Sequence, residues 1–211
     1  MKKITKDKAI SIVVECAKKY EKNLVDKTVM FVCIDKYKNV SYVELEFIKS
    51  NFLHLTGCKV KNGLSAKDFY NRCINGKLGV DDFELSQDGT TELKLEILSI
   101  LLEKNLSANL IGDYKANNPK LYTEKIAGGV KAGMGIVLNK KGKYVPNTAL
   151  NIDVRQYVSD YVRIIATYIK NKDEDKYYEQ VYKAKKVNWD EIKYSKEIED
   201  LILNRVIKIN K

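Results

Sequence analysis

The chain contains the run Thr28-Val-Met-Phe-Val-Cys-Ile-Asp35, the turn-like Lys36-Tyr-Lys-Asn39 and the run Tyr42-Val-Glu-Leu-Glu-Phe47. The first run is rich in Val, Ile and Phe, which favour strands, and the last alternates apolar residues with glutamates. Two such runs joined by a short polar segment predict a β-hairpin. The hairpin leads directly into the segment that holds His54, the only histidine of the chain.

His54 lies in Phe52-Leu-His-Leu-Thr-Gly57. Interpreted as an extended segment that ends at the glycine, this run places His54 and Thr56 on one face. Chemistry that needs a side chain titrating near neutral pH has one imidazole available, that of His54. Composition alone favours an ordinary, partly buried histidine with a backbone hydrogen bond. Both interpretations stay open at this point.

Apolar residues at helical spacing predict three longer helices. They cover residues 7–25, 91–104 and 195–209, and the second is the most hydrophobic, as expected of a central core element. Ser65-Ala-Lys-Asp68 has the form of a capping box and predicts a short helix that ends near Gly76.

From residue 109 onward, short β-like runs follow one another, with turns at 128–129 and 139–142. The runs cover residues 109–111, 122–127, 135–138, 143–150 and 162–169. Such close spacing leaves no room for crossover helices, so we predict a mostly antiparallel sheet. The predicted fold class is α+β: N-terminal helices and the hairpin, then the sheet, then a C-terminal helix. We divide the chain into a single domain over 1–183 and a helical extension over 184–211.

Positive charge is concentrated in the strand-rich half. Residues 112–170 hold 10 basic and 4 acidic residues, a balance of +6 out of a net charge of +10 for the whole chain. Such an excess suits a polyanion such as RNA or DNA, or an acidic protein partner, although lysines also keep proteins soluble.

The sequence indicates a cytoplasmic protein that does not enter the membrane. Its most apolar stretch, 93–106, is interrupted by charges and is shorter than the ~20 residues that span a bilayer. Asp7 and Glu15 spoil the likeness of the N-terminus to a signal peptide. The cysteines are too widely spaced for a zinc site and are predicted to be reduced, semi-buried thiols. They are Cys16, Cys33, Cys58 and Cys73.

Two other groups of residues invite a functional interpretation. The glycines of 128–135 beside Lys131 suggest a phosphate cradle, but no Gly-Lys-Ser/Thr ending and no helix start follow them, which favours turns and bulges. A small-molecule enzyme that uses this segment is our third hypothesis. The acidic pairs at 81–82 and 173–175 are contiguous rather than spaced along one face, which favours solvated loops over a two-metal nuclease. We predict neither a metal nor a cofactor.

The remaining residues suit a metal-independent ribonuclease, in which the RNA 2′-OH attacks the neighbouring phosphorus. Phe52–Gly57, Ala66-Lys-Asp-Phe-Tyr70 and Tyr144-Val-Pro-Asn-Thr148 resemble the fourth group of phage-associated nuclease-like domains of the barnase, EndoU, colicin and RelE assemblage. The resemblance covers most of residues 28–183. It implies N-terminal helices and a four-stranded antiparallel sheet whose face cuts RNA without a metal, in a phage or mobile element.

The same resemblance implies a set of site residues. His54 would be the general acid or base and Thr56 its neighbour. The other implied catalytic residues are Lys125 and Arg163, and the implied RNA-binding residues are Lys131, Arg155 and Lys170. For each of these lysines and arginines taken singly, residue type favours a solvated surface position over a place in the site.

Two hypotheses of different classes follow. The first is an RNA endonuclease of phage or mobile-element origin in which His54 carries the proton. The second is a catalytically inactive phage-derived protein that binds nucleic acid or inhibits a host factor, such as a defence system. The expected partners are therefore RNA or a host protein, and the sequence does not fix the oligomeric state.

Overall fold

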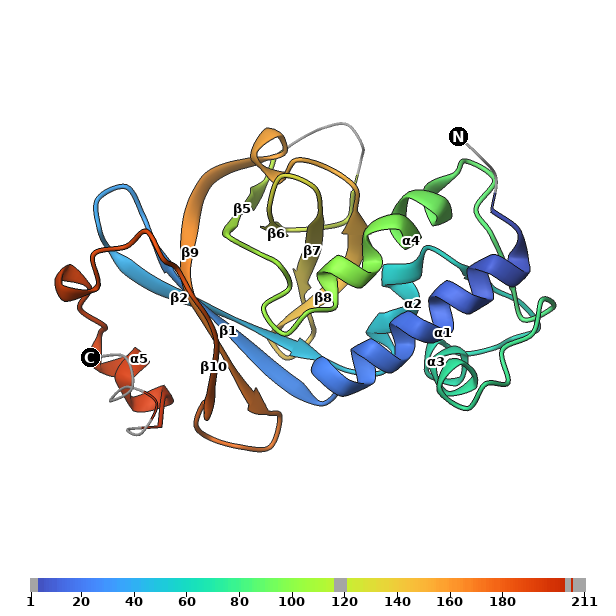
Figure 1. Ribbon diagram of the computed structural model, residues 1–211, viewed down its shortest axis with the longest axis horizontal. Helices are drawn as coiled ribbons and strands as arrows, with labels where there is room; N and C mark the ends of the chain where they lie inside the picture. The colour runs from blue at the N-terminus through green and yellow to red at the C-terminus, as the bar shows by residue number, and fades with distance from the viewer. Residues whose placement is uncertain (1–3, 116–120, 204–205, 207–211) are drawn as a thin grey trace.

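The computed structural model describes residues 4–115, 121–203 and 206. Figure 1 shows an elongated molecule with most helices gathered at one end of a curved sheet, so the fold class is α+β, as predicted. The helices are α1 (Lys6–Asn23), α2 (Asn51–Thr56), α3 (Ala66–Ile74), α4 (Thr90–Leu101) and α5 (Lys196–Leu201), with 3-10 turns η1 (Val154–Gln156) and η2 (Trp189–Glu191). The strands are β1 (Lys27–Ile34), β2 (Val40–Phe47), β3 (Lys59–Val60), β4 (Phe83–Glu84), β5 (Leu110–Tyr114), β6 (Lys125–Gly128), β7 (Gly133–Leu138), β8 (Tyr144–Leu150), β9 (Val158–Asn171) and β10 (Glu179–Lys183).

Strand β9 closes the main sheet into a barrel. Eight strands are hydrogen-bonded in the order β1-β2-β8-β7-β6-β5-β9-β10, and β9 also pairs with β1. Arg163 of β9 lies opposite both Leu110 of β5 and Ile34 of β1, so β5 and β1 occupy opposite edges of β9. The ring therefore consists of β1, β2, β8, β7, β6, β5 and β9, and β10 adds to β9 outside it.

The predicted layout of the sheet was inexact. β2 and β8 run parallel where Leu45 meets Tyr144, so the sheet is mixed, although the other described neighbours are antiparallel. The hairpin β1–β2 belongs to the ring rather than preceding a separate sheet, and the four-stranded sheet implied by the resemblance is too small. The physical reason is the length of β9, which has 14 residues and pairs with β5 along its first half and with β1 along its second.

The segment around His54 is a helix, so the extended interpretation was wrong. α2 ends at Thr56, and the capping residue Gly57 has a φ of 71°, in the left-handed region that glycine adopts readily. Phe52 and Leu55, three residues apart, are both fully buried, and a helix is the conformation that puts such residues on one side. The six residues of α2 are too few for a helical period to be visible in the sequence.

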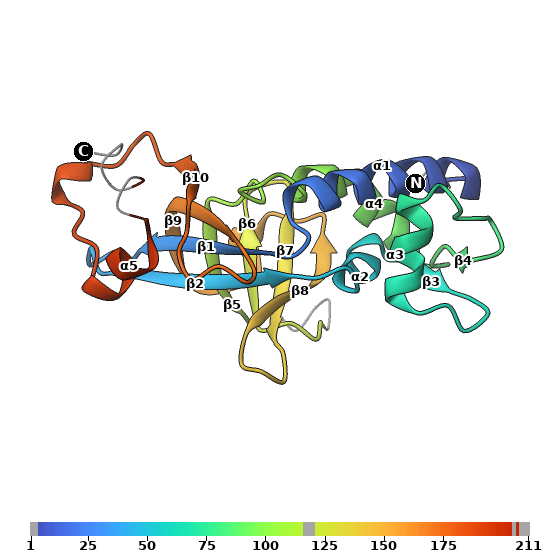
Figure 2. The ribbon, with the colours of Figure 1, turned by 90° about the horizontal axis from the view of Figure 1, so that it is seen from below.

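The helices predicted near residues 7–25, 65–76 and 91–104 are confirmed as α1, α3 and α4. Thr5 and Ser65 cap α1 and α3, because each hydroxyl accepts a hydrogen bond from the backbone amide three residues later, at 3.3 and 3.1 Å. α1 and α4 lie side by side in both views (Figures 1 and 2). The rings of Tyr20 and Phe52, 5.4 Å apart, join α1 to α2 in the main core.

The glycine-rich segment 128–135 belongs to β6, β7 and the turn between them. A Cβ at Gly128 would lie 2.3 Å from the Ala132 carbonyl oxygen, so the backbones approach too closely for any side chain. The β7–β8 ladder shifts register next to Gly135, which is a bulge or irregularity. The interpretation as turns and bulges is therefore the one that the geometry favours.

The four cysteines carry free thiols and are buried, rather than semi-buried as predicted. Within the described ranges, no helix combines the length and the apolar character needed to cross a bilayer.

The C-terminal segment, by which we mean residues 187–203, packs against the face of the sheet turned away from the main core. Its helix α5 begins after Ser195 and ends at Leu201, which is shorter than the predicted helix over 195–209; residues 204–205 and 207–211 lie outside the described part. Ile198 and Ile202 join residues of β1 and β9 in a second apolar cluster. Figure 2 shows α5 at the end of the molecule opposite α3. The domain boundary at 183/184 stays a prediction.

Candidate nucleic-acid site

His54 and Thr56 do not share a surface. His54 is exposed on α2, and its carbonyl accepts a 3.1 Å hydrogen bond from Lys94 Nζ. Thr56 is fully buried, and its hydroxyl donates to the Leu53 carbonyl at 2.8 Å and accepts from the Cys58 amide at 3.1 Å. The Thr56 hydroxyl therefore satisfies backbone groups at the end of α2.

The cationic residues predicted for the site are spread over several elements. Lys125 on β6 and Arg155 in η1 are each ion-paired with a nearby aspartate. Arg163 on β9 donates to a backbone carbonyl at 3.1 Å, and Lys131 is exposed in the loop after β6. Lys170, at the end of β9, lines a cavity that also contains carboxylates.

The register of β1, β2 and β9 places Lys170 beside carboxylates. Thr28 of β1 lies opposite Glu46 of β2 and also opposite Lys170 of β9. Because cross-strand partners point to the same face, the three side chains form one row. Two residues further along, Met30 lies opposite Glu44, so Glu44 shares that face.

The row opens into a cavity of about 310 Å³, which we call the β2 cavity. It lies between β2, the turn joining β7 to β8, and the end of β9. Its lining residues are Thr28, Tyr42, Val43, Glu44, Glu46, Gly142, Lys143, Tyr144, Lys170 and Lys172. Two carboxylates and three ammonium groups line it, a local balance of +1 at neutral pH.

Both carboxylates are held by partners. Glu46 is 7% exposed and pairs with Lys143, and the hydrogen bond from Lys143 to Glu46 raises the pKa of this lysine. Glu44 Oε1 accepts a 2.5 Å hydrogen bond from the hydroxyl of Tyr177. Burial, and then this contact, raise the pKa of Tyr177. An ionised carboxylate has four lone-pair sites, so each glutamate can accept more than one donor.

Two other side chains that line the β2 cavity, Lys170 and Tyr42, also have partners. The Lys170 ammonium lies 4.9 Å from the centroid of the Tyr177 ring, a cation–π contact. The Tyr42 hydroxyl donates to Glu197 of α5 at 2.5 Å, and this contact, with a smaller contribution from burial, raises the pKa of Tyr42 to about 12. The arrangement offers a carboxylate that can take a proton beside cations that can hold a phosphate.

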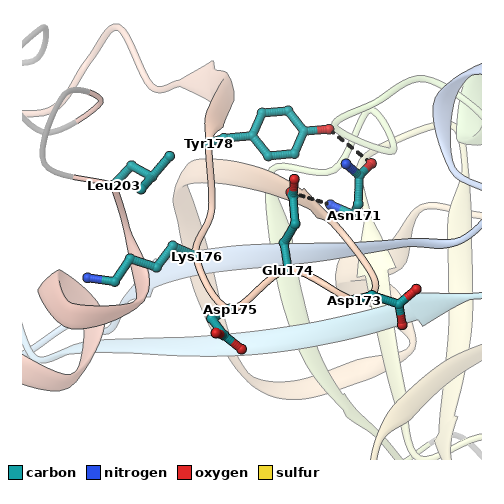
Figure 3. Close-up of a pocket in the computed structure, with 7 residues that line it drawn as sticks. All are labelled: Asn171, Asp173, Glu174, Asp175, Lys176, Tyr178 and Leu203. Carbon is teal, nitrogen blue, oxygen red and sulfur yellow. Dashed lines mark hydrogen bonds between the residues drawn. The ribbon is translucent and has the colours of Figure 1, made fainter.

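A larger hollow, of about 680 Å³, lies at the turn between β9 and β10 (Figure 3). Its charged lining is three carboxylates, Asp173, Glu174 and Asp175, and one ammonium, Lys176. In Figure 3 the Asp173, Asp175 and Lys176 side chains point away from one another, and Glu174 turns back to the Asn171 amide at 3.2 Å. This charge balance repels a phosphate, so the hollow is a poor site for nucleic acid.

The acidic residues do not form a metal site in the part of the chain that is described. No group of three or more His, Cys, Asp or Glu side chains there is arranged to hold a metal ion. Asp82 accepts a 2.8 Å hydrogen bond from the Gly79 amide and pairs with Arg72, and these contacts lower the pKa of Asp82.

Sequence reasoning missed most of the β2 cavity. Glu44 and Glu46 were visible as the polar members of an alternating strand, and Lys143 as part of the next turn. Glutamate is depleted in strands, so two on one strand face were the available indication. What placed them beside Lys170 is the β1–β9 register, which joins residues about 140 positions apart and leaves no local pattern.

One comparison with known proteins identifies a family. The family model described as phage-Barnase-EndoU-ColicinE5/D-RelE like nuclease4 matches residues 12–186. No curated protein and no solved structure matches the chain. The matched range contains every residue that lines the β2 cavity, and it confirms the resemblance found in the sequence. The chain therefore belongs to the phage-Barnase-EndoU-ColicinE5/D-RelE like nuclease4 family, with the nuclease-type function that this membership supports.

Proposed function

We propose that the protein is an endoribonuclease that cleaves RNA by attack of the 2′-OH, without a metal, and that the β2 cavity is its active site. The observation that carries the proposal is the row in which Glu46 and Lys170 flank Thr28, with Glu44, Lys143 and Lys172 lining the same cavity. This reaction needs a base, an acid and cations, and the cavity supplies all three.

In this mechanism Glu44 is the base. It is half-buried and lines the cavity, and the Tyr177 contact engages its Oε1. The carboxylate takes the proton of the 2′-OH, the 2′-oxygen forms a bond to phosphorus, and the bond from phosphorus to the 5′-oxygen breaks. The products are a 2′,3′-cyclic phosphate and a 5′-hydroxyl.

Two lysines divide the remaining tasks. Lys143 is bound to Glu46, which raises its pKa and keeps it charged, so it suits electrostatic stabilisation of the phosphoryl oxygens. Lys170 donates the proton to the departing 5′-oxygen. Solvent then removes the proton from Glu44 and returns one to Lys170, which restores the starting protonation states.

Incubation of the full chain with end-labelled RNA and DNA of one sequence, in EDTA, tests the proposal. We expect cleavage of RNA only, and a loss of about 10²- to 10⁴-fold in rate for Glu44→Gln, which removes a general base. Glu174→Gln, in the acidic hollow of Figure 3, is the matched control and should cleave normally. RNA cleavage that is unchanged in Glu44→Gln would contradict this site.

His54 is the rival proton carrier, as the sequence suggested. It is exposed on α2 and does not line the β2 cavity. His54→Ala in the same assay separates the two assignments. We expect normal cleavage from this variant; a loss as large as that of a general base would move the site to α2.

The second candidate function is a catalytically inactive protein that binds nucleic acid or a host factor. The observation in its favour is that Glu44 and Glu46 already have partners, while the cavity keeps a cationic excess. This protein would bind RNA and DNA and leave both intact, and Glu44→Gln would then bind at least as tightly as the unmodified chain.

A further inference from the structure

The hydroxyl of Tyr177 connects the C-terminal segment to the β2 cavity. Tyr177 is fully buried, and its hydroxyl donates a 2.5 Å hydrogen bond to Glu44. Its ring lies under Lys170, with 4.9 Å between the ammonium and the ring centroid. One side chain thus contacts both proton-transfer residues of the proposed mechanism, Glu44, which takes a proton, and Lys170, which gives one.

The backbone of Tyr177 is held by the C-terminal segment. Its amide donates to the Leu201 carbonyl at 2.8 Å, and its carbonyl accepts from the Leu203 amide at 3.0 Å. These two bonds form a parallel bridge between Tyr177 and Ile202. Ile202 is fully buried in the same apolar cluster as Tyr177, so the bridge is anchored on both sides.

The C-terminal segment also reaches the cavity directly. Glu197 of α5 accepts the 2.5 Å hydrogen bond from Tyr42, which lines the cavity. The matched family range ends at residue 186. The C-terminal residues that hold Tyr177 and Tyr42 therefore lie beyond this range.

We propose that Tyr177 is a positioning residue of the active site, and that the C-terminal segment sets its place, so that residues beyond the matched range are part of the working site. This inference rests on the proposed function. The Tyr177 hydroxyl fixes the rotamer of Glu44 and leaves the rest of its carboxylate for the 2′-OH, and the ring holds Lys170 on the other side of the cavity. Geometry of this kind acts on the chemical step more than on binding.

Tyr177→Phe tests the hydroxyl alone, because phenylalanine keeps the ring under Lys170. With a single-site RNA oligonucleotide, we expect kcat to fall about tenfold and KM to stay within about twofold, since the lysines that hold the phosphate are unchanged. Tyr178→Phe is the matched control: its hydroxyl donates to Asn171 at 3.3 Å, outside the cavity, and both constants should be unchanged.

Ile202→Ala tests the bridge between Tyr177 and the C-terminal segment without changing a residue that lines the cavity. It also replaces Tyr177→Phe as the test if that variant fails to fold. We expect a three- to tenfold loss in kcat with KM unchanged, in a protein whose circular dichroism is that of the unmodified chain.

The outcomes separate the two proposals. A normal kcat in folded Tyr177→Phe or in folded Ile202→Ala, together with an inactive Glu44→Gln, overturns the positioning role and keeps the proposed function. RNA left intact by the unmodified chain, or full activity in Glu44→Gln, overturns the proposed function and the positioning role with it.

Discussion

Glu46 and Lys143 form an ion pair in which only 9% of the glutamate side chain but 57% of the lysine side chain is exposed. The pair links β2 to the turn that leads into β8, next to the parallel contact between Leu45 and Tyr144. Water can solvate the lysine, but the buried Glu46 carboxylate depends on Lys143 for a positive charge nearby.

Lys143→Ala should leave the Glu46 carboxylate buried without its cation. We expect the free energy of unfolding at pH 7 to fall by about 1 kcal/mol, a modest value because the lysine is largely solvated. Urea denaturation measures it. Lys141→Ala in the same turn is the control, with an expected change within about 0.5 kcal/mol. Equal effects from the two variants would contradict a specific pair.

The contribution of Lys143 to the free energy of unfolding should decrease at high pH. The contact with Glu46 raises the pKa of Lys143 in the folded state. The stabilisation is therefore full at neutral pH and up to the ordinary lysine pKa, and it is lost as the pH rises through the higher folded value. The difference between the unmodified chain and Lys143→Ala should shrink there, and a difference that grows with pH would be the wrong sign.

The buried thiols predict a loss of stability at alkaline pH. Burial raises the pKa of Cys33 from 9.0 to about 12, with the same direction for the other three cysteines. An unfolded thiol ionises near 9, so stability should decline as the pH rises from about 9 to about 12.

In the native protein a thiol reagent at pH 8 should modify the cysteines only slowly, and in 6 M guanidinium, roughly the strength needed for full unfolding, it should modify all four rapidly. Rapid native labelling of any cysteine would contradict their burial.

Thr56 should matter for stability and not for chemistry. Thr56→Val keeps the shape but removes the hydroxyl that bonds the Leu53 carbonyl and the Cys58 amide. We expect a loss of about 1–2 kcal/mol in the free energy of unfolding, because buried backbone groups lose their partner. Thr56→Ser should restore most of it. RNA cleavage per folded molecule should be normal in both variants, and a catalytic defect in folded Thr56→Val would return this residue to the site.

The elements that could be predicted are those whose signals lie within their own segment of the sequence. α1, α3 and α4 each carry an apolar period, and the capping box that begins at Ser65 marks the start of α3 in the sequence. α2 has six residues and shows no period. β10, Glu179–Lys183, was missed because this short run has polar residues at both ends and follows a charged turn. The strands of the ring were found in position, but their order was not, because pairing is decided by contacts between distant segments.

The candidate site was predictable only in its basic residues. Basic residues of the strand-rich half were expected to contact RNA, and Lys170, one of the named candidates, lines the β2 cavity together with Lys143, which was not named. The pairing of Thr28 with both Glu46 and Lys170 needs the closed ring, which no sequence period encodes. His54 stood out because it is unique in the chain, and uniqueness says nothing about where a side chain lies.

Lys170 and Lys172 offer the sharpest test of whether nucleic acid enters the β2 cavity. Binding of a 2′-O-methyl oligonucleotide, which cannot be cleaved by 2′-OH attack, measures affinity without turnover. Each phosphate contact that is lost from a single strand lowers the slope of log K against log[salt] by about 0.7. We expect Lys172→Met to show that decrease, and Lys170→Met to show it together with a loss of cleavage rate on ordinary RNA. Lys67→Met on α3, an exposed lysine outside the cavity, is the control and should leave the slope unchanged. Since substitution of any one surface lysine lowers the net charge by the same amount, equal slopes for all three variants would show that the chain attracts RNA by its overall charge and not through this cavity.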